Sequence, residues 1–221
     1  MDNFKNICLR CLPLGELCSN CYLISKTGCL ECVCIDPGDE ADKLLYKIKE
    51  WGLQVKTILL THGHADHIGS LNELREAFPE AKVCVHKKDV VMLEDPERNL
   101  STFLDRIITC RKPDAELEDG EEFISAGLDW KVIWTPGHTE GGCCFLCTEP
   151  ESGESALFSG DTLFSQSVGR TDFPGGNYQE LMDSIKNKLL TLPPETLVFP
   201  GHGEATSVKA EAEGNPYVKL C

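Results

Sequence analysis

Short apolar runs bounded by turn residues predict strands along most of the chain. These runs cover residues 7–12, 21–25, 30–35, 55–60, 81–86, 131–134, 156–158 and 196–199. Most are too short for a helix, and many are rich in Val, Ile, Cys or Phe, which suit a buried strand. Pro13-Leu14-Gly15 and Leu117-Glu118-Asp119-Gly120 predict turns between them.

Three other segments repeat apolar residues every three or four positions and predict amphipathic helices. We expect Asp39 to cap the first helix and Gly52 to end it, Pro79 to end the second, and Asn177 to cap the third. Strands come first and then alternate with helices, and this order recurs. The pattern predicts an α/β fold of two sheets with helices packed outside, in a single domain over residues 1–221.

Composition narrows the possible partners and location. Hydrophobic residues make up 41% of the chain, enough for a packed core, and no apolar run approaches the roughly 20 residues that span a bilayer. The N-terminus lacks the features of a signal peptide, so we expect a cytoplasmic protein. The net charge of -15 would repel nucleic acid and anionic membranes, so neither is an expected partner.

Thirteen cysteines are many for a chain of 221 residues. Cys8, Cys11, Cys18 and Cys21 form the pattern C-x2-C-x6-C-x2-C, which suggests a zinc site. The six-residue spacer is short, however, and the segment follows a strand-turn-strand pattern. We therefore predict reduced thiols that serve as strand residues.

Histidines gather in a few short motifs. Five of the six lie in Thr61-His62-Gly63-His64-Ala65-Asp66-His67, Pro136-Gly137-His138 and Pro200-Gly201-His202, and Ser159-Gly160-Asp161 adds a carboxylate. Each motif directly follows an apolar run. Polar side chains on loops at strand ends can converge at one edge of the sheets, where a rigid scaffold holds them. The sixth histidine, His86, lies outside any motif and is predicted to be structural.

The motifs together supply seven potential metal ligands: His62, His64, Asp66, His67, His138, Asp161 and His202. Burying so many polar groups without a metal would be costly. Seven donors exceed the four that one tetrahedral zinc takes, which predicts two divalent ions with a shared carboxylate. Imidazole and carboxylate favour zinc here, with iron or manganese as alternatives.

THGHADH resembles the T-H-x-H-x-D-H signature of the metallo-β-lactamase superfamily, and the later Gly-His, Gly-Asp and Gly-His motifs follow in that family's order. The resemblance implies a four-layer αβ/βα sandwich. It also implies that one ion binds to His62, His64 and His138, that the second binds to Asp66, His67 and His202, and that Asp161 bridges them.

Other stretches resemble the glyoxalase II-like, or hydroxyacylglutathione hydrolase-like, branch. They are Ser159 to Phe164, Val168 to Phe173, Cys21-Tyr22 and Ile35 to Gly38. This branch implies hydrolysis of a thioester such as S-lactoylglutathione. We expect the compact single-domain form, without the C-terminal helical domain that grips glutathione, so recognition of glutathione is an open question.

The expected mechanism uses a metal-bridging hydroxide, oriented by Asp66, to attack the acyl carbon of a small anionic thioester or ester. One alternative is a persulfide dioxygenase with a single iron, which shares the fold. Another is a metal-dependent binding or sensing module without turnover.

Two side chains outside the ligand set are candidates for substrate contact, Arg170 and Tyr178. An internal ion pair between Arg170 and Asp172 is the favoured interpretation of the first, and Tyr178 could simply begin its helix. The irregular stretch from Asp95 to Asp114 is predicted to be a lid, a pocket wall or a surface connection.

Overall fold

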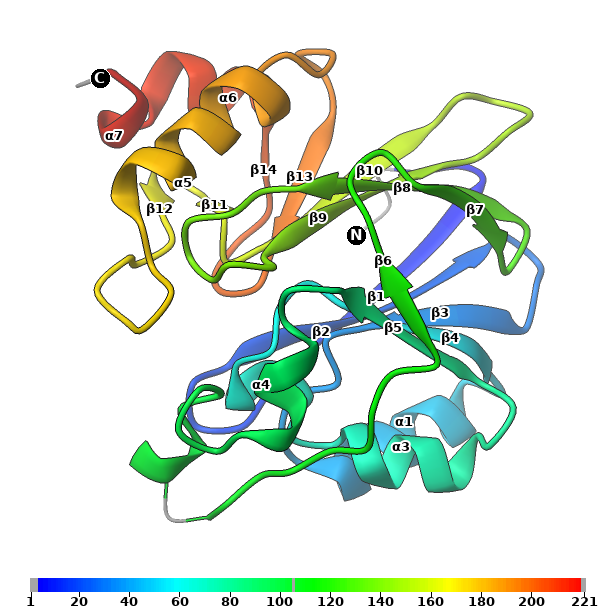
Figure 1. Ribbon diagram of the computed structural model, residues 1–221. Coiled ribbons are helices and arrows are strands. Elements are labelled where there is room, and N and C mark those ends of the chain that lie inside the picture. Colours follow the sequence, from blue (N-terminus) through cyan, green and yellow to red (C-terminus); the bar gives the residue numbers. More distant parts are fainter. Residues whose placement is uncertain (1–3, 105, 220–221) are drawn as a thin grey trace.

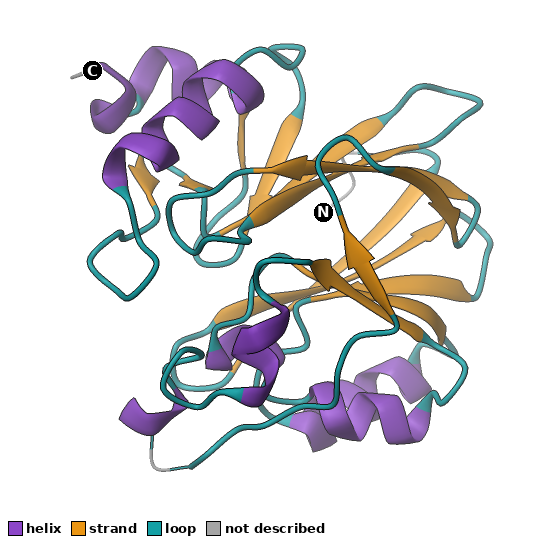
Figure 2. Ribbon diagram, viewed as in Figure 1, coloured by secondary structure: helices purple, strands orange, loops and turns teal. Residues whose placement is uncertain are grey.

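Two six-stranded sheets pack face to face in the computed structural model, which describes residues 4–104 and 106–219. Helices cover the outer face of each sheet, as Figures 1 and 2 show. Within the described residues, no helix has the length and apolar character needed to cross a membrane. The layers confirm the predicted αβ/βα sandwich, while the prediction of one domain over 1–221 reaches into residues 1–3, 105 and 220–221, which lie outside the described part.

The first sheet comes from the N-terminal half. Its strands, in spatial order, are β1 (Ile7–Leu14), β2 (Ser19–Lys26), β3 (Glu31–Ile35), β4 (Gln54–Leu60), β5 (Lys82–His86) and β6 (Ala115–Leu117). The first three strands pair antiparallel, and β3 to β6 pair parallel. The helices of this half are α1 (Ala41–Glu50), α2 (Ala65–Ile68), α3 (Leu71–Ala77), α4 (Val90–Glu94) and a 3₁₀ turn at Ser101–Phe103.

The second sheet comes from the C-terminal half. Its spatial order is β14 (Thr206–Ser207), β13 (Leu197–Pro200), β10 (Ser155–Gly160), β9 (Cys143–Thr148), β8 (Leu128–Trp134) and β7 (Glu122–Ser125). A small hairpin joins β11 (Leu163–Phe164) to β12 (Ser167–Val168). The helices are α5 (Tyr178–Ser184), a π-helical turn at Ile185–Leu189, α6 (Val208–Gly214) and α7 (Pro216–Lys219).

Three apolar layers hold the sandwich together. Between the sheets, Tyr22 packs edge-on against Phe158, with ring centroids 5.2 Å apart, and Phe158 stacks on Phe199 at 5.6 Å. Outside the first sheet, α1 buries one face through Leu44 and Ile48. A third cluster lies between the second sheet and the helices α5 and α6. Burial of these faces is the main force that aligns the strand ends.

Of the two predicted N-caps, the cap of α5 is confirmed and the cap of α1 is wrong. Asn177 caps α5, since its side chain accepts hydrogen bonds from the backbone of Gln179 (3.0 Å) and Glu180 (3.2 Å). Asp39 does not cap α1. The N-cap residue is Glu40, whose φ of 57° is left-handed, and Asp39 instead accepts from the Glu40 amide at 2.6 Å.

The first predicted turn is displaced along the chain. Strand β1 continues through Pro13 and Leu14, and the chain reverses over Gly15 to Cys18, where the Cys18 amide donates to the Gly15 carbonyl at 3.1 Å. Pro13 fits in β1 because this strand lies at the edge of its sheet, where a missing amide proton costs little. The left-handed φ values of Gly15 (68°) and Cys18 (52°) make the reversal.

The N-terminal cysteines lie mostly in strands, as the strand pattern predicts. Cys8 and Cys11 belong to β1, Cys21 to β2 and Cys18 to the turn between them. The Cys21 thiol lies 3.6 Å from the thiol of Cys34 on β3. Among the described residues, the groups of three or more potential metal ligands contain no cysteine.

We predict that changing Cys8 and Cys11 together to Val leaves the metal content unchanged, because both are strand residues outside the ligand groups. Elemental analysis of the purified double variant, beside the unmodified chain, checks this. Loss of one equivalent of zinc per chain would show that the thiols bind metal after all.

Candidate metal centre

The predicted ligands converge at one end of the two sheets. His62 and His64 follow β4, Asp66 and His67 lie in α2, and His138, Asp161 and His202 follow β8, β10 and β13 in turn. Each therefore leaves the end of a buried strand or the short helix beside it. Both halves of the chain contribute to one site, as the motif positions predict. Their role as ligands is a prediction that metal analysis must test.

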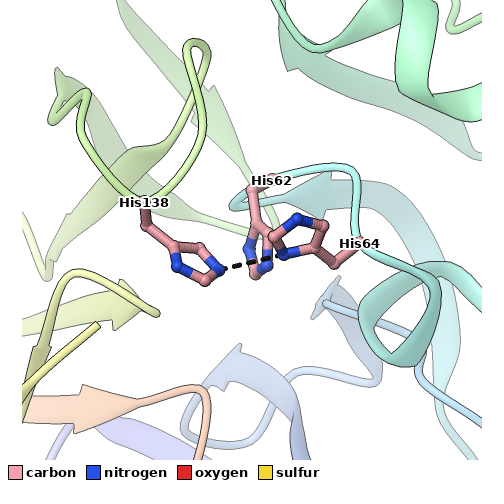
Figure 3. Close-up of side chains that lie close together, drawn as sticks. All are labelled: His62, His64 and His138. Atoms are coloured by element: carbon pink, nitrogen blue, oxygen red, sulfur yellow. Dashed lines mark hydrogen bonds between the residues drawn. The ribbon is translucent and has the colours of Figure 1, made fainter. Parts of the chain in front are cut away.

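The first group consists of His62, His64 and His138, each of which offers one ring nitrogen that lies within 4.8 Å of those of the other two. Figure 3 shows the three rings facing a common point, with His64 Nδ1 2.9 Å from His138 Nε2. The other nitrogen of His138 donates to the backbone carbonyl of Arg170 at 2.8 Å. A carbonyl only accepts, so this bond puts the proton on Nδ1 and leaves Nε2 bare.

A hydrogen-bond chain orients His62 in the same way. The Thr61 hydroxyl donates to the Asp36 carboxylate at 2.6 Å, and it lies 3.0 Å from His62 Nδ1. Its one proton is committed to Asp36, so it accepts from His62 Nδ1–H. His62 Nε2 is then free to bind a cation, with its outer nitrogen held in place.

The second group consists of Asp66, His67 and His202, whose ligand atoms also lie within 4.8 Å of one another. Asp66 Oδ2 is 3.4 Å from His67 Nε2 and 3.2 Å from His202 Nε2. His67 Nδ1–H donates to Asp36 at 3.0 Å, and His202 Nδ1–H donates to the backbone carbonyl of Leu17 at 3.1 Å. Both histidines therefore also present Nε2 to the site.

Asp161 lies between the two groups. Its Oδ1 is 3.4 Å from His67 Nε2, and its Oδ2 is 3.6 Å from Nε2 of both His138 and His202. One carboxylate thus reaches ligands of both groups, as a bridging residue must. Gly201 makes this approach possible, because a Cβ at that position would collide with the Asp161 carboxylate.

The donor set fits metal ions on the evidence of its unpaired atoms. His62 Nε2, His67 Nε2 and Asp161 Oδ1 are buried and have no hydrogen-bond partner within the described residues. Buried polar atoms without a partner are rare, because each loses its hydration. Cations bound in the two groups would satisfy all of these atoms, in a ligand set of the kind that suits zinc or iron.

Local electrostatics also favour cations. Burial lowers the pKa of His62 and of His64 well below 6.5, which keeps both rings neutral and able to bind a metal. Burial acts in the same direction on His67, but Asp66, Asp161 and Asp36 outweigh it and raise its pKa to about 10. The three carboxylates thus create a field that strongly favours positive charge beside His67.

Asp36 is a supporting residue to which sequence reasoning gave no role. Its carboxylate accepts from the Thr61 amide (2.8 Å), the Thr61 hydroxyl (2.6 Å) and His67 Nδ1 (3.0 Å). A signal was present, because Asp36 directly follows a buried strand in Asp36-Pro37-Gly38, as the ligands follow theirs. Strand β3 lies beside β4 in the sheet, so Asp36 reaches Thr61 at the end of β4.

Asp89 is a second supporting residue, and it lies outside every motif. Its fully buried carboxylate accepts from the Gly63 amide (3.2 Å), the Thr139 hydroxyl (2.7 Å) and the Gly141 amide (2.6 Å). Burial raises the pKa of Asp89 to about 6, although these hydrogen bonds oppose the shift. The residue ties the loop between His62 and His64 to the loop that carries His138.

A cavity of about 450 Å³ opens above the centre. Its floor includes His64, Asp66, His138, Asp161 and His202. The described part of the irregular stretch 95–114 forms one wall, through Leu100, Phe103 and Leu104. Asn99 anchors this wall, since its buried amide donates to the carbonyls of Met92 (3.0 Å) and Ile108 (2.9 Å). Of the three possibilities for the stretch, the pocket wall is confirmed.

The remaining candidates have different surroundings. Arg170 lines the cavity, and its Nε and Nη2 each bond Asp172 at 2.7 Å, so the predicted ion pair is present. It is exposed rather than internal, with 56% of the Arg170 and 66% of the Asp172 side chain open to solvent. Tyr178 is the first residue of α5 and is not among the described residues that line the cavity. His86 lies outside both ligand groups and stacks on Trp134, with ring centroids 5.5 Å apart.

Known proteins are similar to this chain in both sequence and architecture. Residues 14–202 match the metallo-beta-lactamase superfamily. The chain belongs to the metallo-beta-lactamase superfamily. Its relatives include the probable metallo-hydrolase YqgX of Bacillus subtilis, which is 38% identical, with 95% of this chain and 96% of that protein covered. Hydroxyacylglutathione hydrolase GloC of Haemophilus influenzae is 34% identical, with 95% and 97% covered.

Solved structures of superfamily members agree with the fold. BLEG-1, described as a B3 metallo-beta-lactamase, superposes with a TM-score of 0.88 at 38% identity, covering 96% of this chain and 99% of that one. TTHA1623 in a di-iron-bound form gives 0.81 at 39% identity, covering 94% and 99%. ETHE1 from Myxococcus xanthus gives 0.76 at 32% identity, covering 95% and 83%. A di-iron form in such a similar protein leaves the predicted preference for zinc open.

We predict that Asp161→Ala lowers the metal content from about two ions per chain to about one, because the variant loses the carboxylate that reaches both ligand groups. Elemental analysis after reconstitution and dialysis measures this. Asp172→Ala, which removes a carboxylate outside the ligand set, is the control. One ion per chain in the unmodified, fully reconstituted protein would refute a dinuclear site.

We predict that Asp89→Asn weakens metal binding by about 10-fold or more, the size of effect known for residues that orient ligands. The asparagine of this variant would carry an NH₂ group in place of one carboxylate oxygen, so at least one of the three donors, Gly63, Thr139 or Gly141, would lose its acceptor. The loop between His62 and His64 would then be held less firmly to the loop that carries His138. Competition with a chromogenic chelator measures the affinity. Glu149→Gln is the control, because Glu149 is also a buried carboxylate, but at the opposite end of β9. Equal losses in both variants would contradict a specific role.

Proposed function

We propose that this member of the superfamily is a metal-dependent hydrolase of small acyl thioesters, with two divalent ions, zinc first among them. The observation that carries the proposal is the cavity itself. Five of the seven expected ligands form its floor, so a bound substrate would meet the metal centre directly. S-lactoylglutathione is one substrate of this class.

The two ions, when bound, lower the pKa of a coordinated water and polarise the substrate carbonyl. The chain itself supplies an ionised carboxylate, Asp66, beside the site where that water would bind. Burial would raise the pKa of Asp66, but His67, His202 and the Ser19 hydroxyl, which donates to Asp66 at 2.8 Å, lower it far below its usual range. Asp66 therefore stays ionised at the cavity floor, where it can accept a hydrogen bond from water and orient it.

The cavity lining favours a thiolate as leaving group. Its described residues include no lysine, tyrosine, cysteine or glutamate that could protonate a departing amine or alkoxide. A thiolate leaves without protonation because thiols have a pKa near 8.5. Because the described lining offers no such acid outside the expected metal ligands, a leaving group that needs no proton supports thioesters over amides and ordinary esters.

The relatives support the same class. GloC is named a hydroxyacylglutathione hydrolase and YqgX a probable metallo-hydrolase. A persulfide dioxygenase with one iron would need fewer ligands than the two complete groups found here. The name of BLEG-1 adds β-lactams to the substrates that deserve a test.

We predict that zinc-loaded protein hydrolyses acyl thioesters, and that Asp66→Asn loses at least about 100-fold in kcat, because a neutral amide holds the second ion more weakly and does not orient the attacking water as the carboxylate does. Thiol release is measured with S-lactoylglutathione and with acetyl-N-acetylcysteamine. Asp183→Asn serves as the control, since Asp183 is an exposed carboxylate on α5 that lines neither cavity.

The rival functions are tested with the same preparations. Iron-loaded protein receives glutathione persulfide while dissolved oxygen is monitored, and a chromogenic β-lactam is added to the zinc form. Rapid oxygen uptake without thioester cleavage would replace the hydrolase with the dioxygenase. Turnover of the β-lactam alone would identify a lactamase. No turnover in any assay would leave a binding or sensing module.

A further inference from the structure

The walls of the cavity differ chemically from its floor. Leu17, Leu100, Phe103, Leu104, Phe164 and Phe173 form apolar surface above the polar ligands. Phe103 is 79% exposed and Leu17 is 56% exposed. Large apolar side chains so open to solvent, gathered at one cavity mouth, indicate a surface that an apolar ligand covers.

Cationic side chains that could hold a negatively charged substrate are already paired. Arg170 is the one arginine or lysine among the described lining residues. Asp172 binds its guanidinium through two bonds of 2.7 Å, and the Phe173 ring lies 3.8 Å from its central carbon. An incoming carboxylate would have to displace Asp172 to gain this cation.

A neighbouring cavity of about 420 Å³ continues the site past Leu17 and Phe103, which line both. It adds Glu16, Asp39 and Arg106. Arg106 is paired with Asp39 at 3.0 Å, so the local balance is acidic. A negatively charged thiol such as glutathione would lose hydration here, find no free cation among the described lining residues and face repulsion.

We propose that the larger cavity binds an apolar acyl chain and the neighbouring one a thiol without negative charge. The inference rests on the proposed function and names its substrate class: a thioester of an apolar acyl group on a neutral or cationic thiol. The thioester carbonyl lies at the ligand floor, the acyl chain lies against Leu100, Phe103 and Phe164, and the thiol portion extends past Leu17 toward Glu16 and Asp39.

The test is a matrix of acyl chains and thiols on metal-loaded protein. Acetyl, butanoyl and hexanoyl groups are each joined to N-acetylcysteamine and to glutathione. We expect kcat/KM to rise by up to about fourfold for each added methylene, the gain from burying one. We expect hexanoyl-N-acetylcysteamine to exceed hexanoylglutathione by about tenfold or more, because two carboxylates go unpaired.

Variants locate the effect. Phe103→Ala and Phe164→Ala should each flatten the chain-length dependence, because both side chains line the cavity that holds the acyl chain, while Leu30→Ala should not. Leu30 is a matched control, since it is 61% exposed and lines neither cavity. Leu17→Arg adds a cation where the thiol portion passes and should lower the KM for the glutathione thioesters, while leaving the preference for long acyl chains unchanged.

Binding provides a readout that needs no turnover. Calorimetry compares the affinities for acetate, butanoate and hexanoate. In each, a carboxylate that can bind at the metal centre carries the alkyl chain. Tighter binding of hexanoate that is lost in Phe103→Ala supports the apolar site, whether or not any thioester is hydrolysed. Failure to hydrolyse every thioester would overturn the proposed function but not the apolar site. Thioester hydrolysis with no dependence on chain length, or with glutathione preferred, would overturn this inference and leave the proposed function intact. Equal affinity for the three carboxylates would also overturn it.

Discussion

The buried carboxylate of Asp36 is the interaction on which the metal centre most directly depends. It accepts from both the amide and the hydroxyl of Thr61 and from the ring of His67. Through the Thr61 hydroxyl it also fixes the tautomer of His62. The backbone carbonyl of Thr61 accepts from the Cys143 amide at 2.9 Å, which attaches the second sheet to the same point. One carboxylate at the end of β3 therefore sets the orientation of ligands in both groups.

The sequence identified the residues that converge at the candidate metal centre, but not the groups that hold them in place, and the difference is physical. His62, His67 and Asp161 sit in motifs that follow apolar strands, and burial of those strands is enough to bring their ends together. The hydrogen bonds of Asp36 and Asp89 depend instead on which strands and loops become neighbours. Asp89 reaches partners 26, 50 and 52 positions away, which no local pattern encodes.

Local geometry explains the other errors and successes. Asn177 capped its helix as predicted because capping needs only the next few residues. Asp39 failed because Glu40 adopts a left-handed backbone and Arg106, far along the chain, pairs with the Asp39 side chain. Strand β9 was missed although its run from Cys143 to Cys147 is apolar throughout and follows Gly141-Gly142, the same signal that predicted the other strands. The cavity walls could not be predicted, since they come from irregular segments whose course depends on side-chain anchors such as Asn99.

The wide spacing of the expected ligands along the chain also determines when during folding a metal ion can bind. Its members run from His62 to His202, and the two sheets supply them jointly. Contacts this distant in sequence carry a large loop-closure cost, so we expect the site to be completed only after the two halves have docked. An ion bound there would crosslink the two halves, and it would bind only after they have docked. Interactions absent from the folding transition state slow unfolding without speeding folding. Metal supply would then govern how long each folded molecule survives more than how quickly it forms.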